Sequence, residues 1–221
     1  MGRGSSKGGS GGSLGHGGGM KPGAVVSTKD MISARHDPTN QAAVDQVLTV
    51  AKDIVGLYGN DAALTGNFQI AELKGADAVS TLGFYDGANI AINQNFMDVA
   101  KMNGAMKDAA KSGYHPKLGG KSGMQAVAAH EYGHGLTDMV AKKMGISGGD
   151  TVDKAATRIV HESKKAAGFK NSLDLAKSIS GYAKTSYAEA VAEAVCDVYC
   201  NGGRAKKASR AIVDTMGKYL R

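Results

Sequence analysis

The sequence predicts an α+β fold, in which a small β-sheet packs against a mostly helical domain. Three observations support this expectation. Apolar residues recur at helical spacing early in the chain and through most of its second half, whereas a central region has the shorter period of β-strands. No internal repeat is present, and 221 residues suffice for one sizeable core. We therefore expect a single domain over residues 24–221 after a flexible Gly/Ser-rich tail over residues 1–23.

The central region contains the expected sheet. Residues 67–73 (NFQIAEL) alternate in polarity as a strand does. Residues 81–94 (TLGFYDGANIAINQ) hold two β-rich runs on either side of Asp86-Gly87, a frequent turn pair, and so predict a hairpin. A polar stretch with several glycines follows, which we expect to be part loop and part helix.

Helices are expected where apolar residues recur every three to four positions between polar or glycine-containing breaks. The first of these helices is expected to end at Gly59, and Gly202-Gly203 is expected to end the one before the last. The expected helical ranges are 40–59, 123–144, 151–167, 172–179, 187–200 and 204–220.

Basic residues outnumber acidic ones and give the chain a net charge of +7. Such a charge would suit an acidic partner, for example nucleic acid. The basic residues are scattered along the sequence, however, and no basic stripe alternates with aromatic residues. We therefore expect a solvated basic surface, and the sequence argues against nucleic acid as the partner.

The two cysteines, Cys196 and Cys200, lie four positions apart in a segment that is expected to be helical. This spacing is not that of a disulfide framework. Buried thiols are the simpler interpretation, and a contribution to a structural metal site is the alternative. Free thiols would fit folding in a reducing compartment.

The segment AVAAHEYGHGL contains the pattern H-E-x-x-H at His130, Glu131 and His134. On a helix the two histidines lie one turn apart on one face, where both can bind the same metal ion. Gly133 within the pattern would let a neighbouring backbone or a substrate approach closely. The alternative is a pair of surface or core-edge histidines on an amphipathic helix. A catalytic zinc normally takes a third protein ligand, which another segment must supply.

Nearby residues do not provide that ligand. Asp138 lies one turn past His134 and would crowd the site. The longer metzincin pattern is excluded, because Thr137 stands where it needs glycine and Val140 where it needs the last ligand.

The sequence favours other roles than metal binding for three further histidines. His161 and Glu162 begin like the motif, but Lys165 replaces the second histidine, so we expect both to be solvated helix residues. His36 and His115 precede Asp37 and Pro116 and are expected in turns.

The segment SGYAKTSYAEAVAEAVCDVY carries two glutamates, Glu189 and Glu193, four positions apart among alanines and valines. Carboxylates are costly to bury on such a surface unless they are paired, hydrogen-bonded or bound to metal. One glutamate as a metal ligand and the other orienting a histidine would explain both. An exposed acidic pair on an ordinary helix is the alternative.

HEYGH and the later SGYAKTSYAEAVAEA together resemble the gluzincin metalloproteases. They are similar in particular to the catalytic domain of anthrax lethal factor and related toxin-like domains. The resemblance covers about residues 65–201 and implies a zincin-like fold with the zinc site between two helices. The hairpin is similar to the strand pair that precedes the active-site helix in this group, and its edge strand would pair with an extended peptide.

The resemblance also implies a role for each residue of the site. His130, His134 and Glu189 would bind Zn²⁺, and Glu131 would be the general base. Tyr182, seven residues before Glu189, would hydrogen-bond the developing oxyanion, although a buried packing tyrosine is the alternative.

Two further carboxylates would support these ligands. Glu193 would hold a zinc-binding histidine in the correct tautomer, and Asp197 could share that role.

The implied function is a zinc-dependent endopeptidase acting on a protein or peptide substrate. One alternative is a catalytically silent zinc-binding protein with a structural or interaction role in a phage particle. The start MGRGSSKGGSGGS resembles leaders of bacteriophage structural or head-associated proteins, so association with phage structural proteins would follow. A helical nucleic-acid binder driven by the positive charge is the second alternative.

Two features of the sequence bear on location. No run of about 18 apolar residues is present, so no membrane span is expected. The N-terminal region lacks the apolar core of an ordinary secretory signal. We therefore expect a cytoplasmic or phage-associated protein rather than a classically secreted one.

Overall fold

The computed structural model describes residues 38–58, 68–73, 75–87 and 89–221. The expected tail over residues 1–23 and the turn residue His36 lie outside this part of the chain. The helices and strands, in chain order, are α2 (Pro38–Tyr58), β1 (Phe68–Ala71), α3 (Asp77–Ser80), β2 (Gly83–Tyr85), β3 (Ile90–Asn93), η2 (Gln94–Phe96), α4 (Val99–Lys111), α5 (Gly123–Lys143), α6 (Thr151–Ala166), α7 (Ser172–Ile179), α8 (Tyr187–Asn201), η3 (Gly202–Arg204) and α9 (Lys207–Leu220).

The expected α+β class is confirmed, because the described chain is mostly helical and contains a small mixed sheet. The helices predicted from periodicity begin and end within a few residues of the observed ones. The polar stretch after the hairpin divides into helix α4, which Asp98 caps through the backbone N–H of Lys101, and a loop over residues 112–122. Such a cap satisfies a backbone N–H that has no partner within the helix.

The sheet has the strand order β1-β3-β2. β2 and β3 form the predicted hairpin and pair antiparallel, while β1 pairs parallel with β3. Asp86 stabilises the turn because its carboxylate accepts a hydrogen bond from the backbone N–H of Asn89 at 2.7 Å, and Gly87 adopts a φ of +95° that favours glycine.

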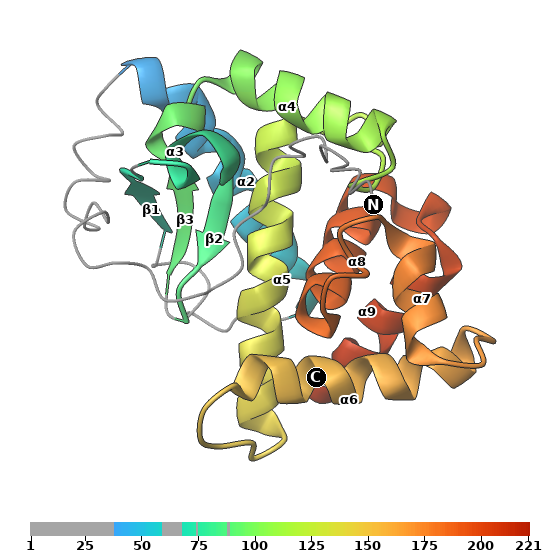
Figure 1. Ribbon diagram of the computed structural model, residues 1–221. Helices are drawn as coiled ribbons and strands as arrows, with labels where there is room; N and C mark the ends of the chain where they lie inside the picture. The colour runs from blue at the N-terminus through green and yellow to red at the C-terminus, as the bar shows by residue number, and fades with distance from the viewer. Residues whose placement is uncertain (1–37, 59–67, 74, 88) are drawn as a thin grey trace, which may run out of the picture.

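Helix α5, which carries the HEYGH motif, lies between the two parts of the fold (Figure 1). The sheet lies on one side of this helix, and α7, α8 and α9 lie on the other. Ser122 begins α5 with a reciprocal capping box, in which its side chain and that of Gln125 each accept a backbone N–H of the other residue. Almost every residue from Gly123 to Ala141 is buried. A helix buried on all sides is a core helix rather than a surface helix, so polar side chains on it need a specific partner.

The close approach of α5 to α8 depends on one glycine. A Cβ atom added at Gly133 would lie 2.7 Å from the Cα of Ala192 on α8. Only a residue without a side chain permits this contact without a shift of one helix. Gly133, inside the motif, therefore allows the backbone of the second helix to approach the two histidines.

One hydrophobic cluster extends from α2 through the sheet and α5 to α9. Val44 and Ile54 from α2, Ile92 from β3 and Ile212 from α9 all belong to it and are fully or almost fully buried. No helix within the described residues is long and apolar enough to cross a membrane.

Candidate metal centre

The two histidines of the motif are buried side by side on α5. His130 is 1% exposed and His134 is 6% exposed, and their ring centroids are 5.1 Å apart. Their spacing of four residues places them one helical turn apart on the same face. The alternative of two surface histidines is therefore wrong.

Helix α8 brings a carboxylate to the same place. Ser186 caps this helix by accepting the backbone N–H of Glu189 at 3.1 Å, which fixes Glu189 in the first turn. The Oε2 atom of Glu189 lies 3.0 Å from Nε2 of His130 and 3.5 Å from Nε2 of His134. Glu189 is 1% exposed, so the alternative of an exposed acidic pair is also wrong.

His130, His134 and Glu189 together can hold a metal ion. One ligand atom from each residue lies within 4.8 Å of the other two, and all three residues are buried. Two imidazoles and one carboxylate suit several divalent first-row metals, zinc among them. Three ligands leave further coordination positions for water or substrate.

A second carboxylate, that of Glu193, forms a hydrogen bond with the ring nitrogen of His130 that does not face Glu189. Oε1 of Glu193 lies 2.8 Å from Nδ1 of His130, on the opposite side of the ring from Glu189. Oε2 of Glu193 accepts a hydrogen bond from the Ser180 hydroxyl at 2.6 Å. Such a carboxylate fixes both the tautomer and the orientation of a ligating histidine.

The charges of this group depend on one another. Burial alone would lower the pKa of His130, but hydrogen bonds to Glu189 and Glu193 and the nearby charge of Glu131 raise it well above its usual value. Burial alone would raise the pKa of Glu193, but His115 and His130 lower it to about 2. A metal ion binds a histidine nitrogen that carries no proton, so metal binding at Nε2 of His130 is linked to the protonation of this ring.

Glu131 and Tyr182 lie next to these ligands. Glu131 is fully buried on α5, and its charge acts on His130. The Tyr182 ring stacks on the His130 ring, with centroids 5.8 Å apart and 29° between the ring planes. The backbone N–H of Tyr182 donates to the carbonyl of Tyr114 at 2.9 Å, which ties its segment to the loop before α5.

Asp197 does not share the role of Glu193, so that prediction is wrong. Its Oδ2 atom accepts hydrogen bonds from the backbone N–H of Lys206 at 2.9 Å and from the Ser209 hydroxyl at 2.6 Å. Oδ1 accepts from the side chain of Asn201 at 2.8 Å. Asp197 therefore holds the start of α9 against α8 and does not contact the histidines.

His115 is a residue of this site whose role sequence reasoning missed. We expected a turn residue, and the residue does lie in the loop before α5, but it is only 2% exposed. Its Nδ1 atom lies 2.9 Å from Oε1 of Glu193. Nothing local in the sequence indicated this contact, because the two residues are 78 positions apart.

Tyr114, beside His115, also faces the site. Its ring lies 5.3 Å from the ring of Tyr182. Burial raises the pKa of the Tyr114 hydroxyl, and the charges of Glu193 and Glu189 raise it further. The Tyr114 hydroxyl therefore keeps its proton in the field of the two carboxylates.

The remaining candidates lie apart from the ligands. His161 and Glu162 are exposed on α6, as expected, and Glu162 pairs with Arg158 at 3.0 Å. Cys196 and Cys200 are buried free thiols, and the hydrogen bond between them, together with burial, raises the pKa of Cys196. Neither cysteine belongs to the metal-binding group found among the described residues.

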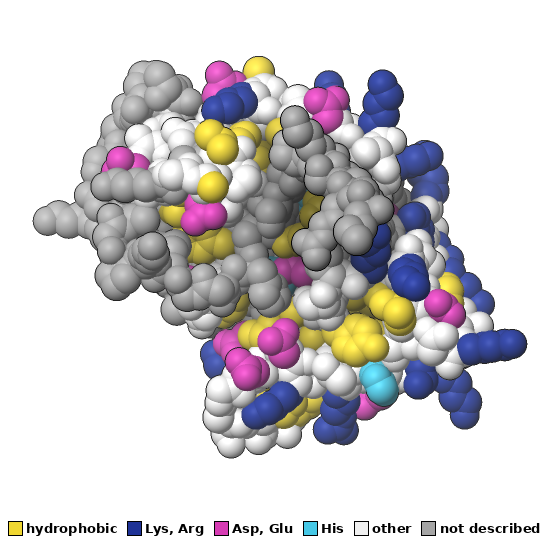
Figure 2. Space-filling view, in the orientation of Figure 1, with side chains coloured by type: hydrophobic (Ala, Val, Ile, Leu, Met, Phe, Trp, Pro, Cys, Tyr) yellow, Lys and Arg dark blue, Asp and Glu magenta, His cyan; other side chains and the backbone are white. Residues whose placement is uncertain are grey.

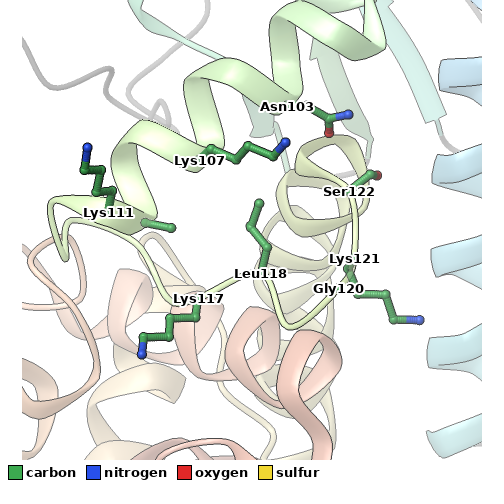
Figure 3. Close-up of a pocket in the computed structure, with 9 residues that line it drawn as sticks. Asn103, Lys107, Lys111, Lys117, Leu118, Gly120, Lys121 and Ser122 are labelled. Carbon is green, nitrogen blue, oxygen red and sulfur yellow. The ribbon is translucent and has the colours of Figure 1, made fainter.

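Basic side chains are unevenly distributed over the face of the molecule that is drawn in Figure 2. Figure 2 shows lysine and arginine side chains gathered on the side of α7 and of the C-terminal ends of α4 and α6. A groove of about 640 Å³ lies between α4 and the loop before α5, and Figure 3 draws the residues that line it. Its lining includes Lys107, Lys111, Lys117 and Lys121.

The groove does not form a second convergent site. In Figure 3 the four lysine side chains point in different directions, and none of the metal-ligand residues lines the groove.

Comparisons of this chain with protein-family models, with curated proteins and with solved structures gave no match.

Proposed function

We propose that this protein is a zinc-dependent endopeptidase of the gluzincin type. The observation that carries the proposal is the convergence of His130, His134 and Glu189 in a buried space, with Glu131 adjacent on the same helix. Two separated segments supply these residues, and both resemble the corresponding segments of the lethal-factor group. A structural metal site would have no need of a glutamate placed between its two histidines.

The donor set fits Zn²⁺, which commonly takes two histidines and one glutamate in proteases. When bound, Zn²⁺ supplies a Lewis acid that polarises a scissile carbonyl and lowers the pKa of water. The surrounding protein excludes bulk water from these ligand side chains and fixes their orientation. Glu193 orients His130, because its carboxylate accepts a hydrogen bond from the Nδ1–H group and leaves Nε2 as the ligand atom.

Glu131 would act as the general base and general acid. Its carboxylate would accept a proton from the attacking water and later pass that proton to the leaving amine. Burial beside the ligands would place this proton transfer in a site from which bulk water is largely excluded.

Tyr182 would stabilise the developing oxyanion. A phenol hydroxyl donates a hydrogen bond, and one preorganised donor is worth about 2–4 kcal/mol in the transition state. The stacking of its ring on His130 and the backbone bond to Tyr114 hold the side chain in place before substrate arrives.

The test compares the wild type with Glu131→Gln. We expect one zinc ion per chain in both proteins, measured by elemental analysis after dialysis. We expect the wild type to cleave members of a peptide library, and the variant to cleave them at least about 100-fold more slowly. Glu162→Gln on α6 is the matched control, and should keep both zinc and activity.

Two results would contradict the proposal. If the wild-type protein binds no zinc, the proposed metal site is wrong. A wild type that holds zinc and cleaves no peptide would instead support a silent zinc-binding module, the phage-particle protein considered above. Association of the basic surface with DNA that weakens steeply with salt, in a protein without zinc, would support the nucleic-acid alternative.

A further inference from the structure

The loop over residues 112–122 carries a buried histidine, His115, whose side chain forms a hydrogen bond with Glu193 at the proposed metal centre. Nδ1 of His115 lies 2.9 Å from Oε1 of Glu193, and Nδ1 of His130 lies 2.8 Å from the same oxygen. One carboxylate oxygen therefore bridges two imidazoles. Among the described residues, Nε2 of His115 has no hydrogen-bond partner, so the bond to Glu193 is what orients its ring.

Proton accounting assigns the role of each nitrogen. An ionised carboxylate only accepts hydrogen bonds, so both Nδ1 atoms must carry protons. For His130 this leaves Nε2 free of its proton when a metal binds. The His115 ring donates a hydrogen bond from Nδ1 to Glu193. If the Glu193 side chain turned away, this buried Nδ1–H group would lose its acceptor.

The same loop also fixes the segment of Tyr182. The backbone N–H groups of Gly181 and Tyr182 donate to the carbonyls of Gly113 and Tyr114, each at 2.9 Å. The His115 ring lies 5.3 Å from the Tyr182 ring. The loop thus contacts the site twice, through a side chain at Glu193 and through the backbone at Tyr182.

We propose that His115 is a positioning residue of the metal centre, acting through Glu193 to hold the imidazole of His130 in its ligand orientation. This inference rests on the metal site proposed above. His115 does not touch the ligand atoms, and its effect passes through the carboxylate that it shares with His130. Ser180 holds the other oxygen of that carboxylate, so Glu193 is fixed from two sides.

The experiment uses two amide replacements that differ only in where they place a donor. Asn at position 115 puts its amide nitrogen close to the position of Nδ1, whereas Gln puts it close to the position of Nε2. Metal-free full-length proteins would be titrated with Zn²⁺ against a chromophoric chelator, and with Co²⁺ to record its visible spectrum. Ser163→Ala, which removes a buried hydrogen bond between α6 and α9, is the control for a purely structural loss.

We expect His115→Gln to bind Zn²⁺ about 10-fold more weakly than the wild type and to shift the Co²⁺ spectrum. We expect His115→Asn and Ser163→Ala to resemble the wild type in both measurements. Equal affinity and spectra for wild type and His115→Gln would overturn the inference, as would equal losses in the Asn and Gln variants. If the wild type itself binds neither metal, the proposed function fails, and this inference fails with it.

If His115→Gln does not fold, His115→Ala takes its place and is compared with His115→Asn. A loss of Zn²⁺ affinity of about 10-fold in the alanine variant, together with wild-type affinity in the asparagine variant, supports the donor role. Wild-type affinity in both variants overturns it, and so do equal losses in both.

Discussion

Two buried acidic residues of α8, Glu193 and Asp197, lie one helical turn apart and have different partners. Glu193 contacts two imidazoles and a hydroxyl. Asp197 contacts a backbone N–H, a hydroxyl and an amide at the start of α9 and the end of α8. Both are buried among alanines and valines, as the sequence suggested. A buried carboxylate needs hydrogen-bond or ionic partners because its burial costs free energy, but that cost does not specify which groups the partners are.

The change along α8 follows from the elements that it crosses. Its first turns face α5 at Gly133 and the histidines, whereas its last turns face the connection to α9. The carboxylates of the first turns therefore lie at the proposed metal centre, whereas the carboxylate of the last turns connects α8 to α9. Four substitutions test this division.

The largest effect is expected for Glu189→Ala. This change removes one of the three proposed ligands. The loss of Zn²⁺ affinity should therefore exceed the roughly 10- to 100-fold loss that is usual when a carboxylate that only orients a ligand is removed. The dissociation constant, measured by chelator competition, checks this. A variant that retains full zinc after dialysis would contradict the assignment of Glu189 as a ligand.

Glu193→Gln should have the next largest effect. The amide keeps the size of the side chain but loses the charge that orients His130, so Zn²⁺ affinity should fall about 10- to 100-fold. The same titration measures it. Unchanged affinity would mean that the contact between Glu193 and His130 does not influence the ligand.

Asp197→Asn should destabilise the protein without affecting the metal. The amide cannot accept every hydrogen bond from Lys206, Ser209 and Asn201, and an unsatisfied buried donor costs about 1–3 kcal/mol. Urea denaturation of the metal-free protein measures the loss, and chelator competition should give the wild-type affinity for Zn²⁺. A large loss of Zn²⁺ affinity would instead show that Asp197 contributes to metal binding.

Glu162→Gln should have the smallest effect. Its carboxylate pairs with Arg158 and Tyr219 on the surface, and the pKa of Glu162, which partial burial alone would raise, is lowered by these two neighbours. Exposed pairs contribute about 0–1 kcal/mol to stability. The free energy of unfolding should therefore change by less than about 1 kcal/mol, and zinc binding should not change. A loss as large as that of Asp197→Asn would contradict the contrast between buried and exposed carboxylates.

Local spacing predicted the parts of the site that lie within single elements. Residues four positions apart share a helix face, which placed His130 beside His134 and Glu189 on the same helix as Glu193. The helices and the hairpin followed from periodicity and turn residues in the same way. That Glu189 rather than Glu193 faces both histidines came from the family resemblance, and the distances agree with it.

Contacts between distant segments could not be predicted in this way. His115 reaches Glu193 across 78 positions, and Asp197 turns toward Lys206 although the spacing allowed it to join Glu193. The loop that carries His115 has no periodicity to indicate which of its side chains are buried.

Short-range patterns in the sequence predict which helices form and which side chains share a face, because these features depend on residues a few positions apart. Which carboxylate meets which partner depends on contacts between segments that are distant in the chain. Gly133 permits the contact between α5 and α8, and the loop before α5 brings His115 to Glu193. These pairings depend on how whole elements pack, because the free energy of burying a charged group is set by neighbours that are distant in the chain.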